Sequence, residues 1–117
     1  ADPMFERDGY DVTIHVPITF SQAVLGDDVE VPTVDGRIVQ HIPEGTQSGT
    51  KFRLRGQGIQ YLNGRGRGDQ YVIVDVEIPK KVTRAQREAL KAFEDSMKED
   101  NYEKRKGFFK NLRDRFS

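Results

Sequence analysis

The sequence contains no cysteine, which excludes disulfides, thiolate nucleophiles and cysteine-based zinc sites. It also carries no net charge, because 19 basic residues balance 19 acidic ones. A neutral chain has no long-range field to attract a phosphate backbone or an anionic membrane, so we expect neither nucleic acid nor a membrane as partner. No apolar run approaches the roughly 18 residues that span a bilayer, and no signal peptide is recognisable. We therefore expect a cytoplasmic location.

Residues in a setting suited to catalysis or metal binding are also scarce. His15 and His41 are the only histidines, and both fall in predicted strands at positions that should face solvent. Neither has a neighbour at metal-ligand spacing or a recognisable nucleophile beside it. Paired acids such as Asp27 and Asp28 lie in polar contexts, where water keeps both carboxylates ionised. We predict no catalytic residue, no cofactor site and no metal site, and hence a chain that is not an enzyme.

Strands dominate the first two thirds of the chain. Residues 11–18 and 70–78 alternate between apolar and polar side chains, as half-buried strands do. Residues 28–33 and 37–42 flank Asp35-Gly36, a dipeptide that favours a type I′ hairpin turn. Phe52 and Leu54 indicate a further short strand. The predicted core contains Val12, Ile14, Val72, Val74 and Val76.

Two capping boxes mark the starts of helices. Thr19 and Gln22 have this spacing, and Gly26 offers a stop, so a helix of barely two turns should plug one end of a sheet. Thr83 and Gln86 repeat the spacing and should begin a longer packing helix that runs to about residue 100. Because strands come first and helices last, the predicted fold is mostly β: a small antiparallel β-sandwich or barrel with a short inserted helix and C-terminal helices.

A glycine-rich stretch, residues 64–69, invites comparison with phosphate-binding loops. It lacks the Gly-Lys-Ser/Thr ending of a P-loop, and it precedes a strand instead of opening a helix. We interpret it as a mobile loop. An RNA contact through its arginines is the alternative, weakened because no aromatic residue lies among them to stack on bases.

The C-terminal end carries apolar residues at helical spacing, beyond a stretch at 100–107 that we interpret as a polar linker. These residues, called the terminal stripe below, are Phe108, Phe109, Leu112 and Phe116. Each would contribute about 1.5–3 kcal/mol if fully buried, so the stripe needs a burial site. We predict a homodimer interface there. Folding back onto its own domain is one alternative, and lying on a membrane is another, because six Lys or Arg accompany the stripe.

Several long stretches resemble the C-terminal region of the bacterial DnaJ-type J-domain co-chaperones. The resemblance covers roughly residues 5–81, in the order that the family uses, and extends more loosely to 107–117. The matching stretches are 5–9, 16–26, 31–36, 42–49, 52–58 and 66–70.

The resemblance implies a second C-terminal β-domain at 5–81 and a helical dimerisation region at 82–117. It also implies that the chain is part of a longer dimeric protein that binds unfolded client polypeptides and delivers them to DnaK, in protein folding and the heat response. The chain lacks the family's His-Pro-Asp tripeptide and Cys-x-x-Cys-x-Gly-x-Gly repeats. ATPase stimulation and zinc binding are therefore expected in other segments of the full-length protein. An independent client-peptide site along an exposed strand edge is the alternative function.

Overall fold

The structure is a computed structural model that describes residues 2–117. The chain forms two compact units, one ending at Ile78 and the other comprising Pro79–Ser117, which we call the β unit and the helical unit. The β unit contains β1 Glu6–Asp8, β2 Asp11–Ile18, α1 Phe20–Leu25, β3 Asp27–Thr33, β4 Gly36–Ile42, β5 Lys51–Leu54 and β6 Gln70–Val76. The helical unit contains α2 Arg84–Ser96, the 3-10 turn η1 Glu99–Asn101 and α3 Glu103–Phe116.

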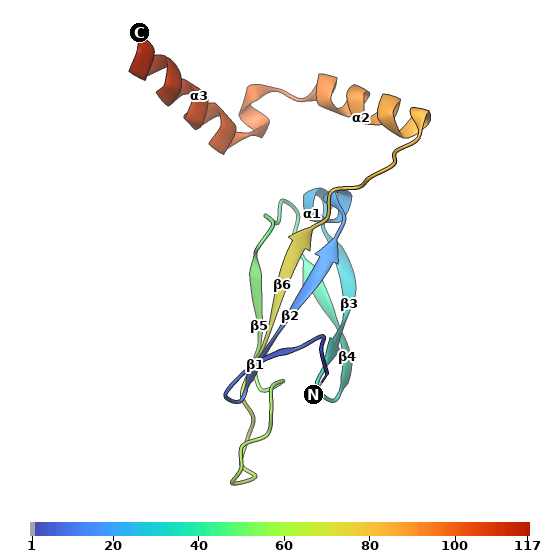
Figure 1. Cartoon of the computed structure of the whole chain (residues 1–117), viewed down its shortest axis with the longest axis vertical. Coiled ribbons are helices and arrows are strands. Elements are labelled where there is room, and N and C mark those ends of the chain that lie inside the picture. The colour runs from blue at the N-terminus through green and yellow to red at the C-terminus, as the bar shows by residue number, and fades with distance from the viewer. Residues whose placement is uncertain (1) are drawn as a thin grey trace. The chain divides into compact units, whose positions relative to one another are not determined.

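The β unit is built from two sheets. A four-stranded sheet has the order β1-β2-β6-β5, and β3 and β4 form a two-stranded sheet (Figure 1). Apolar residues from both sheets and from α1 form one buried cluster: Ile14, Ile18, Ala23, Val31, Ile42, Val72 and Val74. Val12 is also buried, and Val76 is half-buried. The predicted mostly-β fold with C-terminal helices is confirmed, as an open two-sheet arrangement and not a closed barrel.

One strand pairing departs from the expected antiparallel pattern. The two central strands, β2 and β6, run parallel, with Ile14 opposite Val72 and Val16 opposite Val74. Parallel neighbours need a long crossover, and residues 19–69 supply it. The other three pairings, β1 with β2, β3 with β4 and β5 with β6, are antiparallel.

The β3–β4 hairpin forms as expected, but its turn lies one residue earlier than predicted. Thr33 pairs with Gly36, so the two-residue loop is Val34-Asp35. None of Val34, Asp35 and Gly36 has a positive φ, so the predicted type I′ turn at Asp35-Gly36 is wrong. A β-branched residue such as Val34 resists the left-handed conformation that this turn type demands.

The short helix α1 caps one end of the β unit (Figure 1). Both bonds of its predicted capping box are present: the Gln22 amide donates to Thr19 Oγ1 at 3.0 Å, and the Thr19 amide donates to Gln22 Oε1 at 2.9 Å. Gly26 ends the helix with φ 79°. The loop after β4 then satisfies the last helical carbonyls, since the Gly45 amide donates to Val24 O and the Thr46 amide to Ala23 O.

The glycine-rich stretch, which we predicted as a mobile loop, has no regular helix or strand and folds back on itself. The Tyr61 amide donates to Gly66 O at 3.0 Å, and an isolated β-bridge joins Gln60 to Arg67. Two glycines are required where this projection meets the end of β1–β2. A Cβ at Gly58 would lie 2.5 Å from the carbonyl oxygen of Tyr10, and a Cβ at Gly68 would lie closer still.

Asp69 fixes the base of this projection to the sheet. Its carboxylate accepts hydrogen bonds from the Gly56 amide at 3.0 Å and from Arg53 Nε at 2.8 Å, while its own amide donates to Asp11. The Gly56 amide and the Arg53 guanidinium both favour the ionised carboxylate and hold the pKa of Asp69 below its usual range. In return, the hydrogen bond and charge of Asp69 raise the pKa of Arg53. The Gly-Asp end of the stretch is therefore an anchoring point of the fold.

The helical unit corrects one expectation. The predicted polar linker at 100–107 is wrong, because η1 occupies Glu99–Asn101 and α3 already begins at Glu103. Its charged residues are good helix formers, and the single Gly107 costs a helix only about 1 kcal/mol. The predicted capping box of α2 is present, with both Thr83–Gln86 bonds formed. No residue of α2 is buried in the described chain.

Candidate dimer interface

The terminal stripe lies on α3 and is exposed in the single chain. Phe108, Leu112 and Phe116 follow one another at intervals of four residues, which places them on one face of a helix that turns 3.6 residues per turn. Their exposed fractions are 62%, 41% and 78%, and that of Phe109 is 37%. The structure thus presents the four predicted interface residues on one helix and does not bury any of them.

Aromatic rings on α3 are held by their neighbours. The rings of Phe108 and Phe109 meet edge to face, with centroids 5.0 Å apart. The Arg105 guanidinium lies 4.7 Å from the centroid of the Phe109 ring, and that of Arg115 lies 5.9 Å from the centroid of the Phe116 ring. Such cation–π contacts keep a basic charge beside the stripe while leaving the outer ring surfaces available for contact.

Beside the stripe lies a groove of about 390 Å³ within the helical unit, called the α2–α3 groove below. Its apolar members are Met97, Tyr102 and Phe109, of which Met97 and Tyr102 are half-buried. Charged residues complete its lining: Glu94, Lys98, Glu99, Arg105, Lys106 and Arg113. Phe109 belongs to both the stripe and the groove, so the two form one continuous surface.

Sequence reasoning missed this groove for a clear reason. Tyr102 fell in the stretch taken for a linker, and Met97 was assigned to a helix expected to pack on the β-rich body. The signal that could have revealed the groove is the Asn101 side chain, whose Oδ1 accepts from the Lys98 amide at 2.8 Å and closes the η1 turn. An ion pair of 2.6 Å between Lys106 Nζ and Asp100 Oδ1 then connects α3 to η1.

The rim of the groove carries charges without partners. Within the described residues, neither Glu94 nor Glu99 takes part in a salt bridge, and neither Arg113 nor Arg115 does. The groove lining has four basic residues and two acidic ones, so its overall charge is positive.

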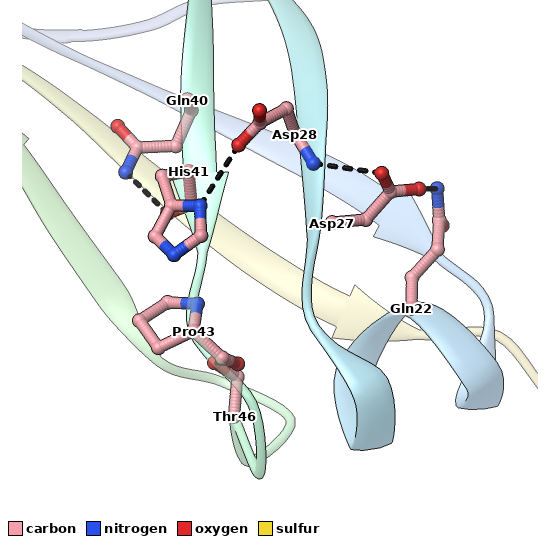
Figure 2. A network of polar contacts seen from close by, with 7 residues as sticks. All are labelled: Gln22, Asp27, Asp28, Gln40, His41, Pro43 and Thr46. Carbon is pink, nitrogen blue, oxygen red and sulfur yellow. Dashed lines mark hydrogen bonds and ion pairs between the residues drawn. The ribbon is translucent and has the colours of Figure 1, made fainter.

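The two histidines are exposed, as predicted, and each has an aspartate partner that sequence reasoning did not identify. His41 Nδ1 lies 2.8 Å from Asp28 Oδ1 on the neighbouring strand, and His15 Nδ1 lies 2.8 Å from Asp75 Oδ2. Figure 2 shows the pair of His41 with Asp28. The nearby Thr46 hydroxyl donates to the carbonyl oxygen of Pro43. These are cross-strand polar pairs on sheet surfaces, and among residues 2–117 no Ser or Thr hydroxyl is hydrogen-bonded to either ring.

Metal binding and membrane crossing have no support in the described part of the chain. Among residues 2–117, no group of three or more His, Cys, Asp or Glu side chains could hold a metal ion. In the same range, no helix has the length and apolar content needed to cross a bilayer.

Comparison with known proteins defines the class to which this fold and surface belong. A family model described as the DnaJ C terminal domain matches residues 1–79, and a second, described as the Chaperone protein DnaJ C-terminal region, matches residues 85–117. The chain belongs to the DnaJ C-terminal domain family, and it is a C-terminal fragment of a bacterial DnaJ-type chaperone.

Individual relatives carry the same description. The chain is 52% identical over 114 residues to the Chaperone protein DnaJ of Ruminiclostridium cellulolyticum, 50% identical over 114 residues to that of Clostridioides difficile, and 48% identical over 115 residues to that of Listeria monocytogenes. These matches cover 97%, 97% and 98% of this chain. They cover only 30%, 30% and 31% of the relatives, so the chain spans about a third of their length.

Proposed function

We propose that this chain is the scaffold and homodimerisation module of a cytoplasmic DnaJ-type co-chaperone. In the full-length protein, other segments would work with it to bind unfolded polypeptides and pass them to DnaK. The observation that carries the proposal is the exposed terminal stripe on α3, at the end of a chain whose relatives are chaperones. Four apolar side chains in water leave several kcal/mol of burial unrealised, and a second copy can supply that burial symmetrically.

The chain's own residues support a non-catalytic role. Its histidines form exposed pairs with aspartates, and the hydrogen-bonded carboxylate of Asp69 anchors the glycine-rich projection. We further propose that this part of the protein holds no cofactor. Because the sequence has no cysteine, thiolate-bound zinc in the full-length protein would belong to other segments.

Removing the stripe tests the dimerisation proposal. We expect light scattering to give a dimer mass for the intact chain and a monomer mass for a chain lacking residues 107–117. Circular dichroism of the β signal serves as control, because the β unit does not include the deleted residues. A deleted chain that keeps the mass of the intact one would refute the proposal.

A second candidate function, client-peptide binding by the β unit, is favoured by one observation. A hollow of about 250 Å³ lies beside the edge strand β1 and has an apolar lining that includes Phe5, Val12, Val34 and Ile59. An extended peptide could add to the β1 edge and place an apolar side chain there. The edge itself opposes this reading, since Glu6, Arg7 and Asp8 are all exposed and charged, as on edges that avoid pairing.

Fluorescence anisotropy with a labelled unfolded polypeptide separates the two functions. Binding that is lost in a Val34→Glu variant, with Val39→Glu as an exposed-strand control, would support the client site. If neither the chain nor its variants binds the polypeptide, the client-site candidate fails while the dimerisation proposal stands.

A further inference from the structure

We propose that the open edge of β5 is a docking site for an extended acidic segment of a partner protein, which adds to the four-stranded sheet as a further strand. The inference goes beyond the proposed dimerisation, because it concerns the β unit and uses no residue of α3. It follows from the position of β5 in the sheet, from the direction of its backbone groups and from the charges along it.

Within the described residues, no strand pairs with the outer edge of β5. It is the last strand in the order β1-β2-β6-β5 and lies at one side of the sheet (Figure 1). The Val74 amide of β6 donates to Thr50 O at 3.1 Å, directly before β5 begins. Because backbone groups alternate in direction along an antiparallel pair, the N–H and C=O groups of Lys51 and Arg53 then point away from β6. An added strand finds its hydrogen-bonding partners there.

Side chains along this edge carry charge of one sign. Lys51 and Arg53 are exposed on the same face, about 7 Å apart, and the exposed Arg55 follows directly after the strand. Arg53 pairs with Asp69 at 2.6 Å. Neither Lys51 nor Arg55 forms a salt bridge within residues 2–117, and the Lys51 ammonium lies 4.6 Å from the centroid of the Tyr71 ring. Two basic groups of the edge are therefore available to an acidic partner.

These charges select among the occupants of the edge. A second copy of β5 would place bases against bases, which is how basic edges avoid pairing with their own kind. The acidic strand β3 of another copy is a poor match, because Asp28 and Glu30 already have partners on β4. An extended segment with a carboxylate at every second residue instead places its acids beside Lys51 and Arg53 on one face of the enlarged sheet.

Peptides that differ only in their backbone test the mode of binding. The probe is a short labelled peptide of alternating glutamate and threonine, titrated with the natural chain in fluorescence anisotropy. We expect it to bind, and to bind less tightly as salt is raised, because salt screens exposed charges. Two further versions carry methyl groups on alternate amides, either those of the glutamates or those of the threonines. Only one set of amides faces β5 in an added strand, so one version should bind at least about fivefold more weakly than the other.

Charge reversal on the protein tests which residues take part. Lys51→Glu with Arg55→Glu should weaken binding of the unmethylated peptide at least about fivefold, whereas Arg53 is left unchanged because its ion pair belongs to the fold. Arg65→Glu with Lys91→Glu is the matched control, since both residues are exposed and the net charge changes by the same amount. The control should bind as tightly as the natural chain, and circular dichroism checks that both variants are folded.

The inference is overturned if the natural chain does not bind the acidic peptide, if both methylated versions bind as tightly as the unmethylated one, or if the two double variants bind alike. Polyuridylate RNA that binds more tightly than the peptide, and is lost in the Lys51→Glu, Arg55→Glu variant, would show that the edge takes a nucleic acid instead. None of these results depends on the mass measured by light scattering, so the dimerisation proposal stands or fails separately.

Discussion

Gly68 and Asp69 tie the glycine-rich projection to the rest of the β unit within two consecutive residues. Gly68 lets the backbone pass against the Tyr10 carbonyl, and Asp69 gathers hydrogen bonds from Gly56 and Arg53. Neither role depends on the mobility or the anion binding that glycine- and arginine-rich sequences suggest. The two residues explain why this stretch is part of the fold.

Substituting Gly68 tests the close approach. Gly68→Ala should destabilise the β unit by about 1–3 kcal/mol, because its Cβ would overlap the Tyr10 carbonyl and force the backbone apart. Gly36→Ala is the matched control, since a Cβ there meets nothing within 4 Å and Gly36 has no positive φ. Urea unfolding measures the stability of both variants. Equal midpoints would show that Gly68 does not lie tightly against the Tyr10 carbonyl.

Asp69 should make stability depend on pH in a defined direction. Its pKa is lowered in the folded state, so its contribution is fully present above the unfolded carboxyl pKa of about 3.9 and is lost as pH falls through the lower folded value. Asp69→Asn should therefore be less stable than the natural chain at neutral pH, and the difference should shrink below about pH 4. Asp8→Asn, on the exposed β1, removes the same charge and is the matched control in the same unfolding series.

Sequence alone could reveal contacts between residues that are close in the chain, but not contacts between residues that are far apart in it. The capping pairs at Thr19 and Thr83 are local, so a spacing of three residues predicts them, and both are present. The contact of Gly68 with Tyr10 joins residues far apart in the chain. The aspartate partners of the histidines likewise depend on strand register, which residue alternation alone does not define.

At the scale of single elements, the cap of α1 can be tested separately. Thr19→Ala should lower the free energy of unfolding of the β unit by about 1 kcal/mol, because the Gln22 amide loses its acceptor. Ser21→Ala is the control, since Ser21 is exposed on the same helix. A Thr19→Ala variant as stable as the Ser21→Ala variant would mean that the cap does not stabilise this helix.

Elements were predicted best where apolar alternation is strong. β2 and β6 follow from their alternating residues, although β6 ends at Val76, before the predicted limit of residue 78. The start of α3 was missed because charged residues such as Glu103 and Lys104 suit an exposed helix as well as a linker. The parallel pairing of β2 with β6 was missed because alternation defines a strand's face and not its direction.

At the scale of the whole molecule, the two units differ in how far they bury their apolar residues. The β unit buries its apolar residues in one core, whereas the helical unit has no buried residue in α2, η1 or α3. Leu90 on α2 is another exposed apolar residue of this unit, at 59%. A unit of this kind is typical of a segment that completes its packing against another chain.

The mass of the chain in solution is the measurement that tests this account most directly. Light scattering over a range of concentrations should give a dimer for the natural chain and a monomer for Phe109→Glu with Leu112→Glu, since losing these contacts costs at least about 3 kcal/mol, a hundredfold or more in affinity. Lys110→Glu changes the charge by the same amount away from the stripe and should remain dimeric. A natural chain that is monomeric throughout, or a double variant that still dimerises, would contradict the account.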